Sequence, residues 1–140
     1  MKRLLIIAVI VCLVIGAFAI FNAQNNNDPV QSTSDLNWNT NFNSALSEAK
    51  QENKQVLIDF YADWCGACQQ LDQDTFSDAK VKEKLNQNYV LLKVDIDTNP
   101  ELASQYQIYS VPTIVIIDSE GQEVRRQEGY FPPDQFLNFI

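Results

Sequence analysis

The chain has 140 residues, of which 46% are hydrophobic, enough for one folded domain with a buried core plus an additional segment. Its formal net charge is −8, and without the basic residues Lys2 and Arg3 the charge falls to −10, which argues against nucleic acid or an anionic lipid surface as a partner. The sequence contains no histidine, which excludes histidine-based acid–base catalysis, Cys–His proteolysis and histidine-containing metal sites.

A basic start and a long apolar run mark the N-terminal region. Lys2 and Arg3 precede an uninterrupted apolar stretch at residues 4–21, close to the roughly 20 residues needed to span a bilayer. We interpret residues 1–21 as an export signal that stays attached as a membrane anchor. Basic residues next to a membrane-spanning segment stay on its cytoplasmic side. The rest of the chain is therefore expected outside the cytoplasm. An Ala-Phe-Ala segment at 17–19 leaves a cleaved, secreted form as the alternative.

The next segment has a composition that cannot build a core. Residues 22–35 are rich in Asn, Gln and Ser, so they are predicted to form a flexible polar linker between the anchor and a domain at residues 36–140. Of the three cysteines, Cys12 lies in the apolar run, and only Cys65 and Cys68 remain for the domain. Two cysteines are too few for a framework of structural disulfides, so this pair is expected to take part in a reaction.

The domain is predicted to begin with a helix and a buried strand. Apolar residues recur at helical spacing over 42–49, with Thr40 or Asn41 as the N-cap and Trp38 packed beneath the helix. The nearly continuous apolar run at 55–61 then predicts a strand that is covered on both faces.

Further helices and strands alternate along the remaining sequence. The elements predicted are a helix from Cys65 to about Thr75, a helix capped by Ser77 or Asp78, a buried strand at 89–96, a helix opened by the Asn99 side chain and Pro100, a strand at 113–118, a tight turn at Gly121, a polar edge strand at 122–127 and a last helix after Pro133.

The segment Trp64-Cys65-Gly66-Ala67-Cys68 places two thiols one helical turn apart at the start of a predicted helix. A helix N-terminus favours a thiolate, so Cys65 is the expected attacking sulfur. Cys68, expected to be less exposed, would resolve the mixed disulfide. The pair would need no cofactor beyond its own disulfide. A structural zinc or copper site on both thiolates is the alternative, disfavoured by the lack of further ligands.

Two carboxylates are candidates for tuning this pair. Asp59 interrupts the apolar strand, so it is expected to be buried with a raised pKa and to accept the proton of Cys68. Its alternative is a side chain that points to solvent. Asp72, four residues after Cys68, lies on the same helical face and would disfavour a thiolate there, or else is an ordinary solvated charge.

The order of elements, with the cysteines at the first strand-to-helix junction, matches the thioredoxin fold. Three parts of the sequence resemble the thioredoxin family: Phe-Tyr-Ala-Asp-Trp-Cys-Gly-Ala-Cys at 60–68, Val-Pro-Thr at 111–113, and Gly129 before the last helix. Residues 61–68 with Thr-Phe-Ser-Asp at 75–78 are similar to the C-terminal periplasmic domain of transmembrane thiol–disulfide interchange reductases. The resemblance covers about residues 36–140. It implies an α/β fold with a central mixed β-sheet flanked by helices, here preceded by a hydrophobic anchor.

The resemblance also implies roles for single residues. It implies that Asp59 is a buried proton acceptor and that Lys93 lies next to it. The alternative for Lys93 is an ordinary surface lysine at a strand edge. Val111 and Pro112 resemble the family's cis-proline loop, which faces the cysteines and pairs with an extended substrate segment; an ordinary trans turn is the alternative. Trp64 would shield the sulfurs and contact substrates, or else cover the core.

Together these features predict an exported, membrane-tethered thiol–disulfide oxidoreductase that mainly reduces disulfides of substrate proteins, in the bacterial periplasm or on the outer face of the membrane. Strong oxidants of this fold carry a histidine between the cysteines, whereas Gly66 and Ala67 offer no such donor. By resemblance, a membrane thiol electron donor re-reduces the pair, and the chain is expected to be a monomer. The rivals are a disulfide-forming oxidase or isomerase and a non-catalytic adaptor.

Overall fold

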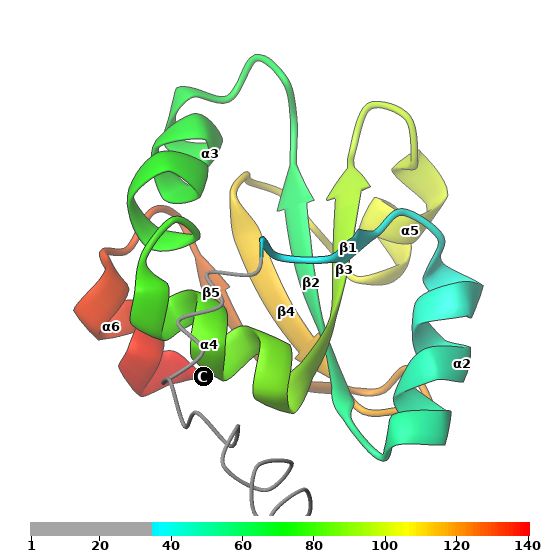
Figure 1. The fold of residues 1–140 in the computed structure, drawn as a ribbon. Helices are drawn as coiled ribbons and strands as arrows, with labels where there is room; N and C mark the ends of the chain where they lie inside the picture. Colours follow the sequence, from blue (N-terminus) through cyan, green and yellow to red (C-terminus); the bar gives the residue numbers. More distant parts are fainter. Residues whose placement is uncertain (1–34) are drawn as a thin grey trace, which may run out of the picture. The chain divides into compact units, whose positions relative to one another are not determined.

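A computed structural model of the chain describes residues 35–140 as a five-stranded sheet with helices on both faces (Figure 1). The strands are β1 (Trp38–Asn39), β2 (Gln55–Tyr61), β3 (Tyr89–Asp95), β4 (Thr113–Ile117) and β5 (Glu123–Glu128). Their order in the sheet is β1-β3-β2-β4-β5. β1, β3 and β2 run parallel, whereas β4 is antiparallel to β2 and to β5. The predicted α/β fold with a mixed central sheet is confirmed.

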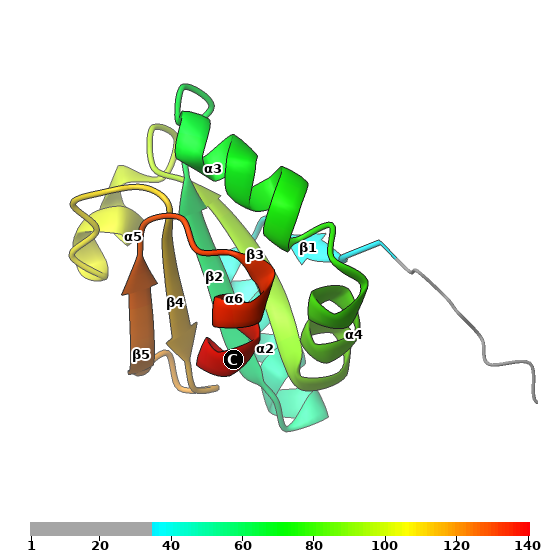
Figure 2. The same ribbon diagram turned by 90° about the vertical axis from the view of Figure 1, so that its left-hand side faces the viewer.

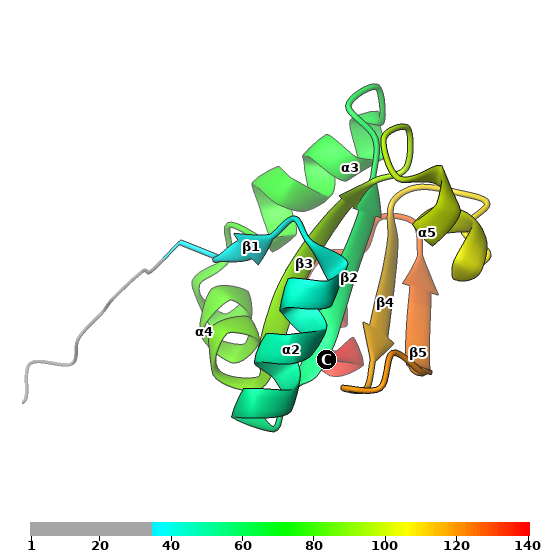
Figure 3. The ribbon, with the colours of Figure 1, turned by 90° about the vertical axis from the view of Figure 1, so that its right-hand side faces the viewer.

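Helices cover the two faces of the sheet unequally. They are α2 (Phe42–Glu52), α3 (Gly66–Gln70), the π-helical segment η1 (Leu71–Thr75), α4 (Ala79–Asn88), α5 (Pro100–Gln105) and α6 (Pro133–Phe139). Figure 2 shows α3, α4 and α6 over one face, and Figure 3 shows α2 and α5 over the other. No helix within residues 35–140 is long and apolar enough to cross a membrane. The predicted anchor and all but the last residue of the predicted linker lie outside the described residues.

The central strand β2 supplies both halves of the core, because successive side chains of a strand point to opposite faces. Val56, Ile58 and Phe60 are fully buried in the cluster beneath α2. Leu57 belongs to the cluster beneath η1, α4 and α6. By the same alternation Asp59 lies on the Leu57 face, which is the face that α3 and η1 cover. The strand therefore presents a carboxylate to the side of the sheet that carries the cysteine helix.

The sequence predicted a capping side chain at the start of α2, α4 and α5, and two of these three caps are present. The side chain of Asn41 accepts a hydrogen bond from the Ser44 N–H at 2.9 Å, as expected of an N-cap. Asp78 caps α4 and accepts from the backbone N–H groups of Lys80 and Val81. Asn99 is the N-cap residue of α5 and Pro100 its first residue, as predicted, but the Asn99 side chain makes no cap bond and its amide instead donates to a backbone carbonyl at the end of β3.

Replacing Asp78 with alanine is expected to destabilise the fold by about 1 kcal/mol, because two N–H groups at the start of α4 lose their acceptor. Urea denaturation followed by circular dichroism measures this change. Lys80→Ala, an exposed substitution on the same helix, is the control and should change stability by less than about 0.5 kcal/mol. Equal stability of the Asp78→Ala variant and the natural chain would contradict the capping role.

The edge at β1 differs from the prediction. Trp38 does not pack beneath the first helix; with Asn39 it forms a two-residue strand whose register places Trp38 beside Leu91 of β3. Its ring meets that of Phe76 edge-on, with 5.1 Å between centroids. A strand of two residues has no periodicity to detect, so the sequence pattern did not reveal it.

The opposite edge agrees with the prediction. β5 is largely exposed and polar, and it begins one residue later than predicted. Gly121 has a φ of 84°, a backbone conformation that favours glycine, in the turn that reverses the chain between β4 and β5. The Tyr106 hydroxyl donates a 2.9 Å hydrogen bond to the Gly121 carbonyl and ties this turn to the end of α5.

Candidate redox site

Cys65 and Cys68 are joined by a disulfide, with 5.3 Å between their Cα atoms. Cys65 is the N-cap residue of α3, and its own N–H donates to the Ala62 carbonyl in the turn that leaves β2. The Cys65 sulfur accepts a hydrogen bond from the backbone N–H of Cys68 at 3.1 Å. In the dithiol form, an N–H in this position stabilises negative charge on Cys65.

The two cysteines are equally shielded from solvent. Each is 5% exposed, so the expectation that Cys68 is the less exposed one was wrong for the disulfide form. Both pack with Ala62 in a small cluster that Val111 and Ile96 partly cover. What distinguishes the two sulfurs is the N-cap position and the N–H that points at Cys65.

Asp59 is buried, with 2% of its surface exposed, which rules out the alternative of a solvent-facing carboxylate. Its Oδ2 lies 3.6 Å from the Lys93 ammonium nitrogen. Its Oδ1 has no hydrogen-bond partner among residues 35–140. Burial raises the pKa of Asp59 from 3.8 to about 7, an effect that Lys93 opposes and the charge of Asp72 reinforces. A carboxyl with this pKa exchanges protons near neutral pH.

Lys93 is half-buried between two carboxylates and two aromatic rings. Its ammonium group donates to both oxygens of Asp72 at 2.7 Å, a shorter contact than the one to Asp59. The same group lies 4.9 Å from the ring centroid of Tyr61 and 5.6 Å from that of Trp38. The reading of Lys93 as an ordinary surface lysine was therefore wrong. Asp72 is likewise not a plain solvated charge, since it binds Lys93 and acts on the pKa of Asp59.

Replacing Lys93 with methionine is expected to raise the pKa of Asp59 above its value of about 7, because the nearest cation is lost while burial and the Asp72 charge persist. Methionine keeps an apolar stem between the rings of Tyr61 and Trp38. A ¹³C-NMR titration of the Asp59 carboxyl measures the shift. Lys80→Met is the matched control. An unchanged or lower pKa in the Lys93 variant would contradict the proposed electrostatics.

Trp64 stands in solvent beside the disulfide. Its side chain is 69% exposed, so the alternative that it covers the core was wrong. The indole N–H donates a 2.8 Å hydrogen bond to Asp97 Oδ2. Sequence reasoning missed Asp97, although one signal was available: it follows β3, whose last residue, Asp95, pairs with Tyr61 at the end of β2.

The second wall of the site is the loop before β4. The Val111–Pro112 peptide bond is cis, as the resemblance implied. Val111 packs against the cysteine cluster, and the Pro112 carbonyl accepts a 2.8 Å hydrogen bond from the N–H of Gly129. Gly129 has a φ of 82°, which explains a glycine at this position. The loop before β4 and the end of β5 are thus joined next to the disulfide.

The two residues between the cysteines are exposed on the first turn of α3. Gly66 and Ala67 carry no side-chain hydrogen-bond donor. A Cβ atom built on Gly66 would meet no atom within 4 Å, so packing leaves room there for a larger side chain. The absence of a donor between the sulfurs is therefore a feature of the sequence and is not imposed by crowding.

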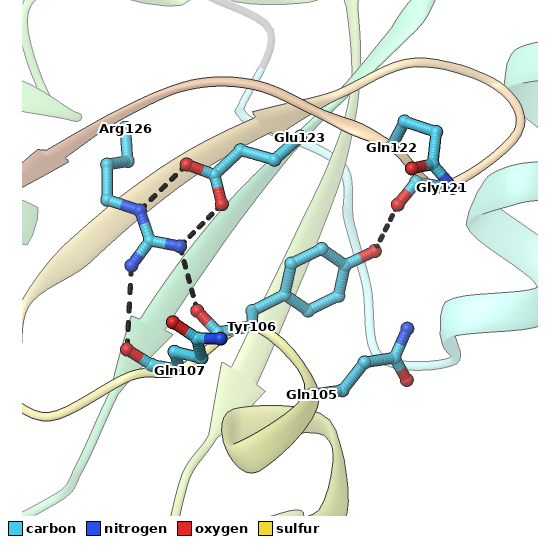
Figure 4. Close-up of a pocket in the computed structure, with 7 residues that line it drawn as sticks. All are labelled: Gln105, Tyr106, Gln107, Gly121, Gln122, Glu123 and Arg126. Carbon is cyan, nitrogen blue, oxygen red and sulfur yellow. Dashed lines mark hydrogen bonds and ion pairs between the residues drawn. The ribbon is translucent and has the colours of Figure 1, made fainter.

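A surface hollow lies away from the cysteines (Figure 4). It has a volume of about 360 Å³ and is lined by Gln105, Tyr106, Gln107, Gly121, Gln122, Glu123 and Arg126. The Arg126 guanidinium donates to Glu123 and to the backbone carbonyls of Tyr106 and Gln107. Arg126 is the one cationic residue that lines this hollow, and it is already bound. We therefore interpret the hollow as a structural junction between α5 and β5. Within residues 35–140 no group of three or more cysteine or acidic side chains is arranged to hold a metal ion.

The family profile described as a thioredoxin-like domain matches residues 42–140. The chain belongs to the thioredoxin-like family. Among curated relatives of this thioredoxin-like chain is the thiol:disulfide interchange protein DsbD of Vibrio cholerae, 37% identical over 103 residues, or 69% of this chain and 17% of the relative. DsbD of Actinobacillus pleuropneumoniae is 37% identical over 95 residues, 64% of this chain and 16% of that protein. The chain thus spans about a sixth of the length of these relatives.

Solved structures agree with the fold. A thioredoxin from Thermus thermophilus is 29% identical with a TM-score of 0.68, and the match covers 75% of this chain and 84% of that one. The oxidised C-terminal domain of Neisseria meningitidis DsbD has a TM-score of 0.62 at 24% identity, with 74% of this chain and 96% of that chain covered. The second likeness concerns the fold alone.

Proposed function

We propose that this thioredoxin-like chain is a membrane-tethered, exported thiol–disulfide oxidoreductase that mainly reduces disulfides in other proteins. The observation that carries the proposal is the Cys65–Cys68 disulfide at the start of α3, with the Cys68 N–H directed at the Cys65 sulfur. The printed name of the DsbD relatives, thiol:disulfide interchange protein, supports the same chemistry. The tether and the location outside the cytoplasm rest on the apolar run at residues 4–21 and the two basic residues before it.

The reaction is a two-step exchange of disulfide bonds. In the reduced chain, the Cys65 thiolate attacks one sulfur of a partner's disulfide; that bond breaks, and the other partner sulfur leaves as a thiolate that takes up a proton. Cys68 then loses its proton and attacks Cys65, which releases the partner's second thiolate and closes the Cys65–Cys68 disulfide. Two electrons pass to the partner. A dithiol electron donor, proposed to be a membrane protein, must reduce the chain again before the next cycle.

Asp59 is proposed to accept the proton of Cys68 in the second step. It lies on the face of β2 that α3 and η1 cover, the same side as Cys68. Its pKa of about 7 suits proton exchange at neutral pH, and its Oδ1 is free of other partners among residues 35–140. Lys93 and Asp72 are proposed to tune this carboxyl: the first stabilises its charged form and the second opposes it.

Substrate binding is proposed at the two walls of the disulfide. Val111 touches the cysteine cluster and precedes Pro112, and its backbone is proposed to pair with an extended segment of the partner. Trp64 offers an exposed ring on the other side. Gly66 and Ala67 are proposed to keep the pair reducing, because they provide no donor to stabilise the reduced thiolate beyond the backbone.

The proposal is tested by a single-turnover reaction between the reduced full chain, kept in mild detergent, and a peptide that carries one disulfide. We expect two peptide thiols to be released for each chain that is oxidised, with Cys65–Cys68 recovered as the disulfide by mass spectrometry. Cys65→Ala should produce none. No reduction by the natural chain would contradict an oxidoreductase and favour an adaptor that only holds its partners.

A further inference from the structure

Two large aromatic side chains stand in solvent on the two loops that flank the disulfide. Trp64 precedes Cys65 and is 69% exposed, and Tyr109 is 90% exposed on the loop that leads to Pro112. Both loops lie at one end of the sheet, because Phe60 near the end of β2 pairs with Thr113 at the start of β4 (Figure 1). Exposed aromatic rings beside a reactive bond are typical of surfaces that bind a partner.

The Trp64 ring is restrained by a hydrogen bond in the free chain. Its indole N–H is bound to Asp97 Oδ2 at 2.8 Å, and the Asp97 N–H donates to Asp95 Oδ1 at 2.9 Å. These two bonds connect the ring to the end of β3. A ring held in this way loses little freedom on binding, which favours its use as a contact surface.

Acidic side chains surround the same loops. We call these four residues the acidic rim: Asp63, Asp95, Asp97 and Glu128. Asp63 lies two positions before Cys65, Asp95 ends β3 beside Tyr61, and Glu128 accepts a 3.3 Å hydrogen bond from Ser110 on the loop before Pro112. The rim therefore borders the disulfide both on the Trp64 side and on the Val111 side.

The described cations offset the charge of this rim only in part. Residues 55–79 and 94–124, which supply the loops around the disulfide, contain no lysine or arginine. Lys93 is bound to Asp72. Arg126, on the strand next to the Val111 loop, is bound to Glu123, and its charge also acts on Glu128 of the rim. Arg125 donates to a backbone carbonyl of α6. The face that meets the partner thus carries exposed aromatic rings within a field of negative charge.

We propose that this face selects partner segments in which lysine or arginine flanks the cysteine to be reduced. The proposal rests on the proposed function, since it concerns which disulfides Cys65 attacks. Opposite charge accelerates encounter and fixes orientation. The side chains of arginine and lysine also stack on the faces of tryptophan and tyrosine, which Trp64 and Tyr109 present. A disulfide flanked by acidic residues is repelled from the same surface.

The test compares two disulfide peptides that differ only in having lysine or glutamate beside the cysteines. The reduced full chain is mixed with each, and each second-order rate constant is divided by the rate constant for dithiothreitol, which corrects for the effect of flanking charge on the disulfide itself. At low ionic strength the corrected rate should favour the lysine peptide by about tenfold. At about 1 M salt the ratio should approach one.

Matched charge variants assign the effect to the rim. The double variant Asp63→Asn, Glu128→Gln removes two rim charges and should cut the preference several-fold. Asp118→Asn with Glu120→Gln removes two charges near the far hairpin and should leave it unchanged. Equal corrected rates for the two peptides, or a preference that survives the rim variant intact, would overturn the inference while the proposed function stands. Reduction of neither peptide would overturn both.

Discussion

Replacing Cys68 with alanine is expected to stop turnover and to leave partner proteins covalently attached to Cys65. The thiolate at the N-cap of α3 can still attack a partner's disulfide, but no second sulfur remains to release the product. Non-reducing electrophoresis and mass spectrometry of the full chain, isolated from cells that express the variant, detect the mixed disulfides.

The matched variants make this result specific. Cys65→Ala should give no adducts. The double variant Cys65→Ala, Cys68→Ala should retain only the non-covalent binding expected of a non-catalytic adaptor. Adducts that form through Cys68 as readily as through Cys65 would show that the N-cap position does not select the attacking sulfur. Unchanged non-covalent capture with no adducts at all would favour the adaptor.

Asp59→Asn is expected to stabilise the oxidised fold in neutral and alkaline solution. The folded chain holds the Asp59 proton up to a pKa of about 7, whereas the unfolded chain loses it near 3.8. The folded state therefore binds more protons between these values, and stability falls as the pH rises from about 4 through 7. The full difference is on the order of 4 kcal/mol, and it is present above pH 7. Asparagine carries no charge, so the variant does not lose this stability as the pH rises.

Urea denaturation of both oxidised proteins at pH 4 and pH 8 measures the effect. The variant should exceed the natural chain clearly at pH 8 and differ little at pH 4. Asp74→Asn, at an exposed position of η1, is the control and should leave the pH profile unchanged. The same Asp59 variant should release its partner more slowly from the mixed disulfide at neutral pH, because the proposed acceptor for the Cys68 proton is missing. Parallel pH profiles for the natural chain and the variant would refute the raised pKa.

Most of the fold was predictable because it depends on local patterns. The apolar run of β2, the Asn41 and Asp78 caps and the glycine at the β4–β5 turn each leave a signal within a few residues. The short strand at Trp38 was not predictable in this way. It forms because β3 offers an unpaired edge, and that edge exists only after the sheet has assembled.

The features of the site also divide into those that local sequence predicts and those that depend on the assembled fold. The cysteines and the burial of Asp59 follow from residues adjacent in the sequence, and Lys93 and Pro112 were placed by family resemblance. The Asp72–Lys93 pair and the Trp64–Asp97 bond join residues 21 and 33 positions apart, so no local pattern encodes them. The Trp64–Asp97 bond depends on parallel β2 and β3 ending side by side, and the Asp72–Lys93 pair depends on contact between η1 and β3.

The central claim, that Cys65 and Cys68 form an electron-donating pair, is tested most directly by the equilibrium of the full chain with reduced and oxidised glutathione. The fraction of dithiol at each ratio gives the reduction potential. Because the segment between the cysteines offers no side-chain donor to the reduced thiolate, we predict a strongly reducing value, towards the roughly −270 mV of thioredoxin. A value near about −120 mV, typical of a disulfide-forming oxidant, would contradict the account.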